Sequence, residues 1–134
     1  MYLLDTNVII EMLHGNRQVI EKIYSAGFSN CCVCEMTIAE LFFGAVKGGN
    51  PKNFEDIEVV RGLFSEETVG PCFREYAEAR LALKQKGKPV DLMDLFIASV
   101  ALHHDYILVT HNINHFSRIP NLKIEDWKVS RYVL

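Results

Sequence analysis

The chain has 134 residues, a mass of 15.3 kDa and a formal net charge of −3, a length at which we expect one domain over residues 1–134. Hydrophobic residues make up 49% of the chain and the mean hydropathy is +0.08, which supports a packed core and argues against intrinsic disorder. The predicted pI of 5.9 argues against a protein that coats nucleic acid through overall positive charge.

The distribution of apolar residues argues against a membrane protein. Apolar runs are short, and none approaches the roughly 18 residues that a membrane helix needs. The N-terminus carries an acid at Asp5, whereas a signal peptide begins with basic residues followed by a longer apolar stretch. We therefore expect a cytoplasmic protein that does not contact a membrane.

The apolar spacing predicts strands and helices in alternation. In chain order we expect a strand over 1–5, helices over 7–14 and 17–26, a strand over 31–36, helices over 37–47 and 51–63, a strand over 66–70, helices over 71–86 and 91–104, a strand over 106–109, a helical turn over 112–116 and a strand over 122–126. This order predicts an α/β fold with a mostly parallel sheet and helices on both faces.

Local signals mark several of the predicted helix ends. Gly27 and Gly87 are typical helix stops, and Asn50 followed by Pro51 is typical of a helix start. Thr37 and Glu40 have the spacing of a capping box. In a parallel sheet, ligands bind beyond the carboxyl ends of the strands. That rule directs attention to residues 5–7, 35–40 and 110–112.

The four cysteines are predicted to be buried free thiols. Cys31 and Cys34 form a C-x-x-C pair, but Cys-Cys-Val-Cys is typical of an inner strand, on which these two side chains would face opposite ways. No second Cys or His pair with zinc-site spacing accompanies them. Packed thiols are consistent with a reducing cytosol.

Three carboxylates stand out because their neighbours in sequence are apolar. Asp5 ends the first strand, Glu40 lies within Ile38–Phe43, and Asp94 lies within Leu92–Ile97. An ionised carboxylate among apolar groups is costly unless it is paired, hydrogen-bonded or bound to a cation. If the three acids converge, a divalent cation is the simplest compensation, and oxygen ligands favour Mg²⁺ or Mn²⁺ over zinc.

Each acid also has a purely structural interpretation. Asp5 suits a helix N-cap, Glu40 suits the capping box of Thr37, and Asp94 suits the first turn of a helix that Asp91 caps. These interpretations treat the acids as independent of one another. They do not account for three acids at strand ends or in the first turns that follow, so spacing alone leaves both possibilities open.

Other charged residues give weaker signals. A basic set on the 71–86 helix and just beyond it is either a solvated helix face or a local nucleic-acid footprint: Arg74, Arg80, Lys84, Lys86 and Lys88. His103 and His104 end a predicted helix, where an interaction with the helix dipole is favoured over metal binding. His111 lies beside the predicted site, where a contact with phosphate is an alternative to a structural role.

Four segments, taken in order, resemble the PIN domain family and more narrowly its VapC-type toxin ribonucleases. The resemblance covers essentially the whole chain and rests on Leu3–Ile9, Thr37–Leu41, Asp94–Ala101 and Leu108–Asn112, the last followed by His115-Phe116 and Ile119-Pro120. It implies a three-layer domain, with a central mostly parallel sheet flanked by helices, and an acidic pocket that binds Mg²⁺ or Mn²⁺.

The resemblance also assigns roles to individual residues. It implies that Asp5 and Asp94 bind the metal, that Glu40 acts through water, and that Thr6 orients a water or a ligand beside the first acid. Asn112 stands where many family members carry Asp. Its neutral amide can bond a water or a phosphate oxygen but adds no negative charge, so a fully occupied second metal position is in doubt.

As an activity, the resemblance implies that a metal-activated water hydrolyses RNA in line and leaves a 5′-phosphate and a 3′-hydroxyl. As partners, it implies a second copy in a homodimer and a VapB-type antitoxin whose C-terminal segment occupies the active-site groove. Phe42-Phe43 or the 54–64 helix would offer that segment an apolar anchor, unless these aromatics are simply core. The alternatives are an RNA-processing PIN nuclease without an antitoxin, a catalytically silent PIN scaffold, and a phospho-receiver domain.

Overall fold

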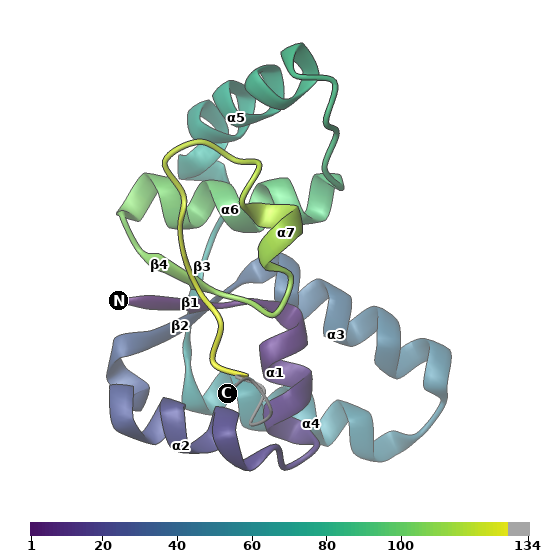
Figure 1. Ribbon diagram of the computed structural model, residues 1–134. Helices are drawn as coiled ribbons and strands as arrows, with labels where there is room; N and C mark the ends of the chain where they lie inside the picture. The colour runs from purple at the N-terminus through teal and green to yellow at the C-terminus, as the bar shows by residue number, and fades with distance from the viewer. Residues whose placement is uncertain (129–134) are drawn as a thin grey trace.

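The computed structural model describes residues 1–128, and its elements alternate along the chain as Figure 1 shows. In chain order the elements are β1 (Tyr2–Leu4), α1 (Thr6–Leu13), α2 (Arg17–Ala26), the 3₁₀ turn η1 (Phe28–Asn30), β2 (Cys31–Cys34), α3 (Glu35–Gly48), α4 (Pro51–Leu63), β3 (Ser65–Glu67), the 3₁₀ turn η2 (Gly70–Cys72), α5 (Phe73–Gln85), α6 (Leu92–His104), β4 (Ile107–Val109), α7 (Ile113–Phe116) and β5 (Lys123–Glu125).

The five strands form one sheet in the order β3-β2-β1-β4-β5. Each strand pairing among residues 1–128 is parallel, which confirms the predicted α/β class. In the central strand, Leu3 aligns with Cys32 on one side and with Leu108 on the other. The chain builds the sheet outward from β1 through β2 to β3, and then returns to place β4 on the other side of β1. Its order therefore reverses between β1 and β4.

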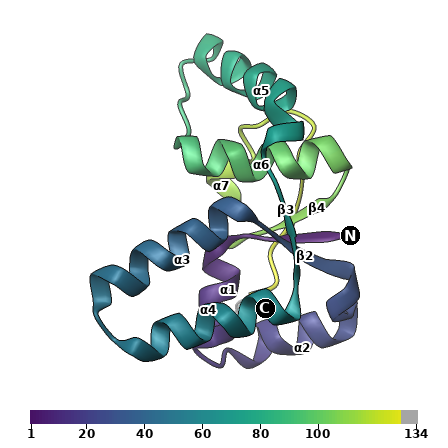
Figure 2. The same ribbon diagram turned by 180° about the vertical axis from the view of Figure 1, so that it is seen from behind.

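Helices cover both faces of the sheet, so the fold has three layers. Helices α1 to α4 lie on one face, while α5, α6 and α7 lie on the other, as Figures 1 and 2 show. Successive strand residues alternate between the two cores because side chains alternate along a strand. Leu3 and Leu108 pack on the α6 side, and Leu4 and Val109 pack on the α1 side.

The cysteines of β2 follow the same alternation. Cys31 packs with the α1–α4 layer, whereas Cys32 and Cys34 pack with the α5–α7 layer, so Cys31 and Cys34 do face opposite ways. All four cysteines, Cys72 included, are buried and free. Burial raises the pKa of the Cys31 thiol to about 11 and those of Cys32 and Cys34 to about 12, which keeps these three protonated and unreactive.

Most of the predicted helix boundaries are confirmed. Helix α2 ends at Gly27, and the Asn50 side chain accepts a hydrogen bond from the N–H of Lys52 while Pro51 opens α4. Asp91 caps α6 by accepting from the N–H of Met93 at 3.0 Å. The segment predicted as a helix over 71–86 instead begins with the 3₁₀ turn η2, and α5 starts at Phe73.

The capping box predicted at Thr37 and Glu40 is wrong. Helix α3 already starts at Glu35, and the Cys34 sulfur accepts from the N–H of Met36 at 3.4 Å. Strand β2 therefore ends at Cys34 rather than at residue 36. Thr37 lies inside the helix and is fully buried, which frees Glu40 from any capping role. Among residues 1–128, no helix combines the length and the apolar character that crossing a membrane requires.

Candidate active site

Asp5 and Thr110 meet where the strand order reverses. The two residues directly follow β1 and β4, whose carboxyl ends lie at the same edge of the sheet because the strands are parallel. Asp5 Oδ2 accepts a hydrogen bond from Thr110 Oγ1 at 2.8 Å, and Asp5 Oδ1 accepts from the N–H of Thr6, also at 2.8 Å. Asp5 is also the N-cap of α1, so its structural interpretation holds alongside its place in the site.

Glu40 is brought to this edge by α3, and Thr6 holds it there. Thr6 lies at the start of α1, and its hydroxyl donates to Glu40 Oε1 at 2.7 Å. The Thr37 hydroxyl lies 3.2 Å from the same Thr6 oxygen. Helices α1 and α3 are therefore joined by a polar contact between side chains on the same face of the sheet. This contact directs the Glu40 carboxylate toward Asp5.

Asp94 enters the site from the opposite layer, on the first turn of α6. Its Oδ2 lies 2.9 Å from Nε2 of His115 on α7. That nitrogen is buried, and its nearness to Asp94 lowers the pKa of the Asp94 carboxyl, which opposes the effect of burial. Asp91, one turn earlier, is exposed and serves as the cap of α6.

The pKa values of the acids show that they share one electrostatic environment. Burial is the main cause that raises the pKa of the Asp5 carboxyl; the Thr110 and Thr6 hydrogen bonds partly oppose it, and repulsion from Asp94 adds to it. Burial also raises the pKa of Glu40, with repulsion from Asp5 and Asp91. The pKa of Asp94 is also raised, and burial is the largest cause. His115 opposes this shift, while repulsion from Asp91 and Glu40 adds to it. The carboxyl groups of Asp5, Glu40 and Asp94 are thus close enough to influence one another's charge, and this cluster is called the acidic pocket below.

The donor set of this pocket suits a hard divalent cation. Its charged donors are carboxylate oxygens, the ligands that Mg²⁺ and Mn²⁺ prefer, and their raised pKa values reflect negative charge that the protein itself compensates incompletely. Within residues 1–128 the acids do not bring three ligand oxygens within 4.8 Å of one another. A cation here would therefore have few direct protein ligands and would keep several of its waters, as Mg²⁺ usually does.

Asn112 and His111 lie in the same loop but are held differently. The backbone N–H of Asn112 donates to Thr110 Oγ1 at 3.0 Å, while its side chain is exposed and no hydrogen bond within residues 1–128 joins that side chain to the acids. His111 Nδ1 lies 2.9 Å from Asp126 Oδ1 beyond β5, and its buried Nε2 has no hydrogen-bond partner in the described part of the chain. Although Asp126 holds its ring, His111 remains close enough to Asp5 for its charge to lower the pKa of that carboxyl.

Three contacts at this edge were not predicted from the sequence. Thr110 orients Asp5, Thr37 contacts Thr6, and His115 contacts Asp94. Thr110 could have been found, because a polar residue directly ends a buried strand that the prediction placed beside the first strand's acid. Nothing local identifies Thr37 or His115, whose partners lie 31 and 21 positions away along the chain.

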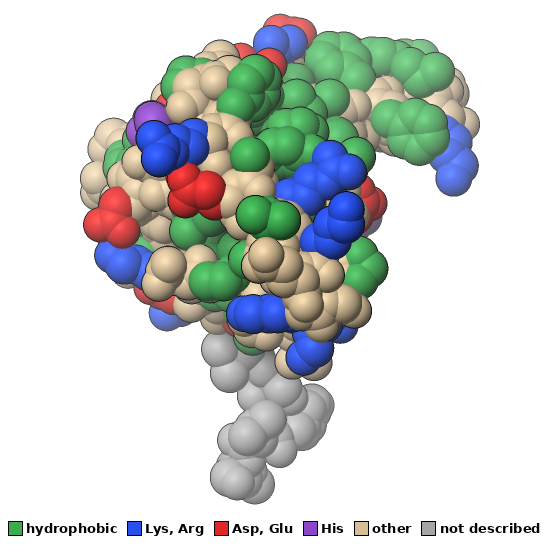
Figure 3. Space-filling view, turned by 90° about the horizontal axis from the view of Figure 1, so that it is seen from above, with side chains coloured by type: hydrophobic (Ala, Val, Ile, Leu, Met, Phe, Trp, Pro, Cys, Tyr) green, Lys and Arg blue, Asp and Glu red, His purple; other side chains and the backbone are tan. Residues whose placement is uncertain are grey.

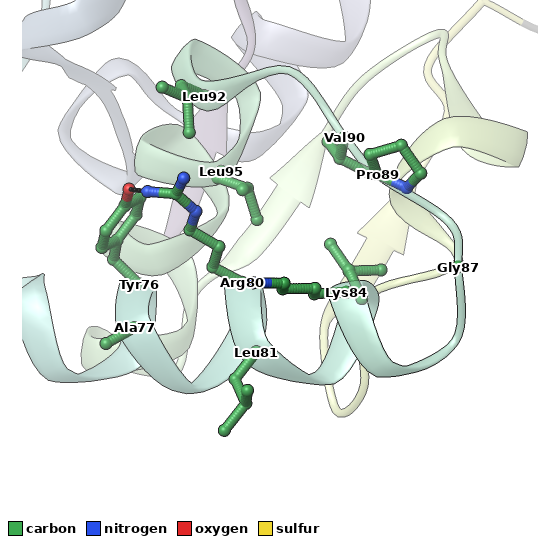
Figure 4. A pocket seen from close by; sticks show the side chains of 11 residues that line it. Tyr76, Ala77, Arg80, Leu81, Lys84, Gly87, Pro89, Val90, Leu92 and Leu95 are labelled. Atoms are coloured by element: carbon green, nitrogen blue, oxygen red, sulfur yellow. Dashed lines mark hydrogen bonds between the residues drawn. The ribbon is translucent and has the colours of Figure 1, made fainter.

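A groove of about 710 Å³ runs between α5 and the start of α6. Figure 4 shows its mostly apolar lining, including Leu92 and Leu95 of α6, with Arg80 and Lys84 of α5. Figure 3 shows hydrophobic side chains next to Lys and Arg side chains on the face seen from above. Arg80 also donates a hydrogen bond to the Tyr76 hydroxyl at 2.7 Å. Part of the predicted basic helix face therefore lines this groove.

Comparisons with known proteins identify the family. The family model of the PIN domain matches residues 2–122. The chain belongs to the PIN domain family. It is 32% identical over 130 residues to a "tRNA(fMet)-specific endonuclease VapC" of Salmonella typhimurium, a match that covers 94% of this chain and 97% of that relative.

Two solved structures extend the likeness from the PIN sequence to the fold. One is VapBC2 from Rickettsia felis bound to a DNA fragment from its promoter, with a TM-score of 0.87 and 28% identity over 95% of this chain and 98% of that one. The other is VapBC-1 from nontypeable Haemophilus influenzae, with a TM-score of 0.81 and 30% identity over 94% and 97% of the two chains. Within the PIN family, the chain is therefore of the VapC type, as its motifs predicted.

Proposed function

We propose that this PIN domain is a divalent-metal-dependent endoribonuclease and the toxin of a VapBC-like toxin–antitoxin pair. The observation that carries the proposal is the convergence of Asp5, Glu40 and Asp94, each raising the pKa of at least one other, in a chain whose relatives are named ribonucleases or endonucleases. A protein without a cationic ligand gains nothing from gathering one buried and two half-buried acids, because their mutual repulsion lowers its stability.

In this proposal Asp5 and Asp94 hold Mg²⁺ or Mn²⁺. The bound ion would neutralise the charge of a phosphodiester and lower the pKa of a water. Asp5 suits this role because Thr110 and the backbone of Thr6 fix the orientation of its carboxylate, while each oxygen keeps a further lone pair for a ligand. Asp94 suits it because it reaches the same pocket from the opposite layer, so that the two acids approach the ion from two sides.

Glu40 is proposed to accept the proton of the attacking water. Its Oε1 is engaged by Thr6, which leaves Oε2 to receive that proton. Its pKa is raised mainly by burial, and a carboxylate whose pKa is closer to neutrality is a better proton acceptor at physiological pH. Thr6 would act as a positioning residue, and the exposed amide of Asn112 would bond a phosphate oxygen of the RNA.

The proposed partners are an RNA substrate, a VapB-like antitoxin and a second copy of the chain. The structural relatives from Rickettsia felis and Haemophilus influenzae are VapBC assemblies, which supports an antitoxin. Phe43 and Val46 on α3 are 71% and 69% exposed, so the interpretation of Phe43 as a core residue is wrong. These two side chains form an apolar surface to which an antitoxin could bind. Phe42, in contrast, is half-buried and packs near Phe54 with ring centroids 6.3 Å apart.

The test is cleavage of a total RNA pool by the full-length protein purified free of antitoxin, with Mg²⁺, with Mn²⁺ and with EDTA. The proposal predicts cleavage with either ion, 5′-phosphate ends on the products, and no cleavage with EDTA or in the Asp94→Asn variant. The matched control is Asp105→Asn at the end of α6, an exposed acid that pairs with Lys123 and should cleave like the wild type. Cleavage that persists in EDTA would refute the metal dependence.

Two alternatives within the PIN family have distinguishable outcomes. An RNA-processing nuclease would cleave RNA in the same way but would have no antitoxin gene beside its own. A silent scaffold would bind its partners without cleaving any RNA, and its acids would be replaceable without loss of function.

A further inference from the structure

A second group of metal-ligating side chains lies at the other end of α6 from Asp94. It consists of Cys72, His103 and His104, each of which offers a ligand atom within 4.8 Å of the others. Asp94 is in the first turn of α6 and the two histidines are in its last turn, which places them about 14 Å apart along the helix axis at 1.5 Å per residue. This cluster therefore lies outside the acidic pocket, and within residues 1–128 it is the one group of three with this spacing.

The cluster joins two parts of the α5–α7 layer. Cys72 ends η2, just before α5, while His103 and His104 end α6. Cys72 is fully buried, and its sulfur lies 3.7 Å from the carbonyl oxygen of Thr68, a weak contact for a thiol. His103 is exposed, so one ligand of the cluster is open to solvent.

Each of the two histidines has a carboxylate partner. His103 Nδ1 contacts Glu75 Oε1, and His104 Nε2 lies 3.3 Å from Glu67 Oε2. Histidines that bind a metal usually have their second ring nitrogen on a carboxylate, which fixes the ring and makes the first nitrogen a stronger ligand. Tyr106 adds to this arrangement by stacking on His104 and donating to Glu67 Oε1 at 3.2 Å.

The donors select a different class of ion from the acidic pocket. One thiol and two imidazoles are soft and borderline ligands, which suit Zn²⁺ and disfavour Mg²⁺. Tetrahedral zinc with these bond lengths holds its ligand atoms about 3.5 Å apart, so small rotations of side chains already within 4.8 Å complete the site. Water would complete the four ligands, because Glu75 and Glu67 pair with the histidines and do not belong to the cluster of mutually close ligand atoms.

We propose that Cys72, His103 and His104 form a zinc site that fastens the start of α5 to the end of α6. The Cys72 thiol gives up its proton as the sulfur–zinc bond forms, and the proton passes to solvent. The site is structural in this proposal and is independent of the nuclease activity proposed above.

Cobalt(II) tests the site because a cysteine ligand gives it a thiolate-to-cobalt absorption band that oxygen ligands do not give. The full-length protein is reduced, stripped with EDTA, desalted and titrated with Co²⁺, and Zn²⁺ is then added. We expect the band to saturate at one Co²⁺ per chain, to disappear on addition of one equivalent of Zn²⁺, and to be lost in both Cys72→Ser and His103→Asn. Because His103 is exposed, its variant should fold, which circular dichroism checks, even if Cys72→Ser does not.

Three control variants separate this site from other ligands. Cys31→Ser removes a buried thiol on the opposite face of the sheet, His14→Asn removes an exposed histidine, and Asp94→Asn alters the acidic pocket; all three should keep the band. Zn²⁺ should also raise the unfolding temperature of the wild type by several degrees and leave that of His103→Asn unchanged, because only a protein that binds the ion is stabilised by it. A wild type without the band, or a folded His103→Asn with an unaltered band, would overturn the proposal.

Discussion

Thr110 donates a hydrogen bond to Asp5 across 2.8 Å, although the two residues are 105 positions apart in the chain. They follow β1 and β4, the adjacent strands between which the strand order reverses. Helices leave such a point toward opposite faces of the sheet and open a crevice between them. The fold therefore explains why acids from both helical layers come together at this edge of the sheet. The hydroxyl of Thr110 fixes the orientation of one of them, Asp5.

The Thr110–Asp5 bond should contribute measurably to stability. In Thr110→Val the buried Asp5 Oδ2 loses its hydroxyl donor, and an unsatisfied buried acceptor costs about 1–3 kcal/mol. We expect the free energy of unfolding in urea to fall by this amount, while Thr110→Ser, which keeps the hydroxyl, should lose less than half as much. A Thr110→Val protein as stable as the wild type, or a Thr110→Ser protein that loses as much stability as Thr110→Val, would contradict this role of the hydrogen bond.

Thr6 should affect cleavage more than stability, because its hydroxyl positions Glu40. Removing it in Thr6→Val lets the Glu40 carboxylate rotate away from the attacking water, and general-base contributions of this kind are about 100-fold or more. We expect the rate of RNA cleavage to fall at least about tenfold in Thr6→Val and to recover in Thr6→Ser. Single-turnover rates at saturating Mg²⁺ would measure this. A Thr6→Val enzyme as fast as the wild type would remove Thr6 from the site.

These polar contacts mark the boundary of what the sequence could predict. Helix ends at Gly27, Asn50 and Asp91 were predicted correctly because their signals are local: a glycine that adopts positive φ, or a side chain that bonds a backbone N–H two residues on. The buried alternation of β2 was predictable for the same reason. The candidate acids were found because carboxylates in apolar segments are unusual wherever they occur.

What failed depended on distant parts of the chain. Thr37 and Glu40 matched a capping box locally, but the burial of Thr37 against Thr6 lets α3 begin two residues earlier, so Glu40 faces the acids instead. The pairing of His115 with Asp94 and the cluster of Cys72 with His103 depend on how α6 packs against α7 and η2. No spacing in the sequence encodes those contacts.

The negative charge of the acidic pocket should lower the stability of the folded protein at pH 7. Burial and repulsion raise the pKa of Glu40 in the folded state above its ordinary 4.5. The protonated carboxyl therefore stabilises the folded state fully below the unfolded-state pKa, and this stabilisation is lost as the pH rises through the folded-state pKa. Above that pH, Glu40→Gln should unfold about 2 °C higher than the wild type, a shift that corresponds to about 0.5 kcal/mol. Below pH 4 the difference should vanish. Thermal unfolding without divalent ions, repeated at both pH values, measures this; a gain that does not depend on pH would contradict it.

Phe43 should matter for the antitoxin and not for folding. Its side chain is 71% exposed on α3, so Phe43→Ser should change the free energy of unfolding by less than about 0.5 kcal/mol. If Phe43 anchors the antitoxin, its loss should weaken binding by about 2 kcal/mol, or roughly 30-fold. Calorimetric titration with the antitoxin encoded beside the gene would measure this. Leu81→Ser, on α5 and 56% exposed, is the control that should bind normally; a Phe43→Ser protein with unchanged affinity would place the anchor elsewhere.

The central claim is that Asp5 serves a catalytic metal ion, and a matched pair of aspartate variants tests it most directly. Asp5→Asn keeps an oxygen for the Thr110 hydrogen bond but removes the charge, whereas Asp105→Asn changes an exposed acid at the end of α6 whose φ of 57° asparagine readily adopts. In Mg²⁺-dependent cleavage of total RNA, we predict that Asp105→Asn matches the wild type. Asp5→Asn should lose about 100-fold or more, the rate equivalent of several kcal/mol of metal stabilisation. Equal cleavage by a folded Asp5→Asn protein would contradict the account.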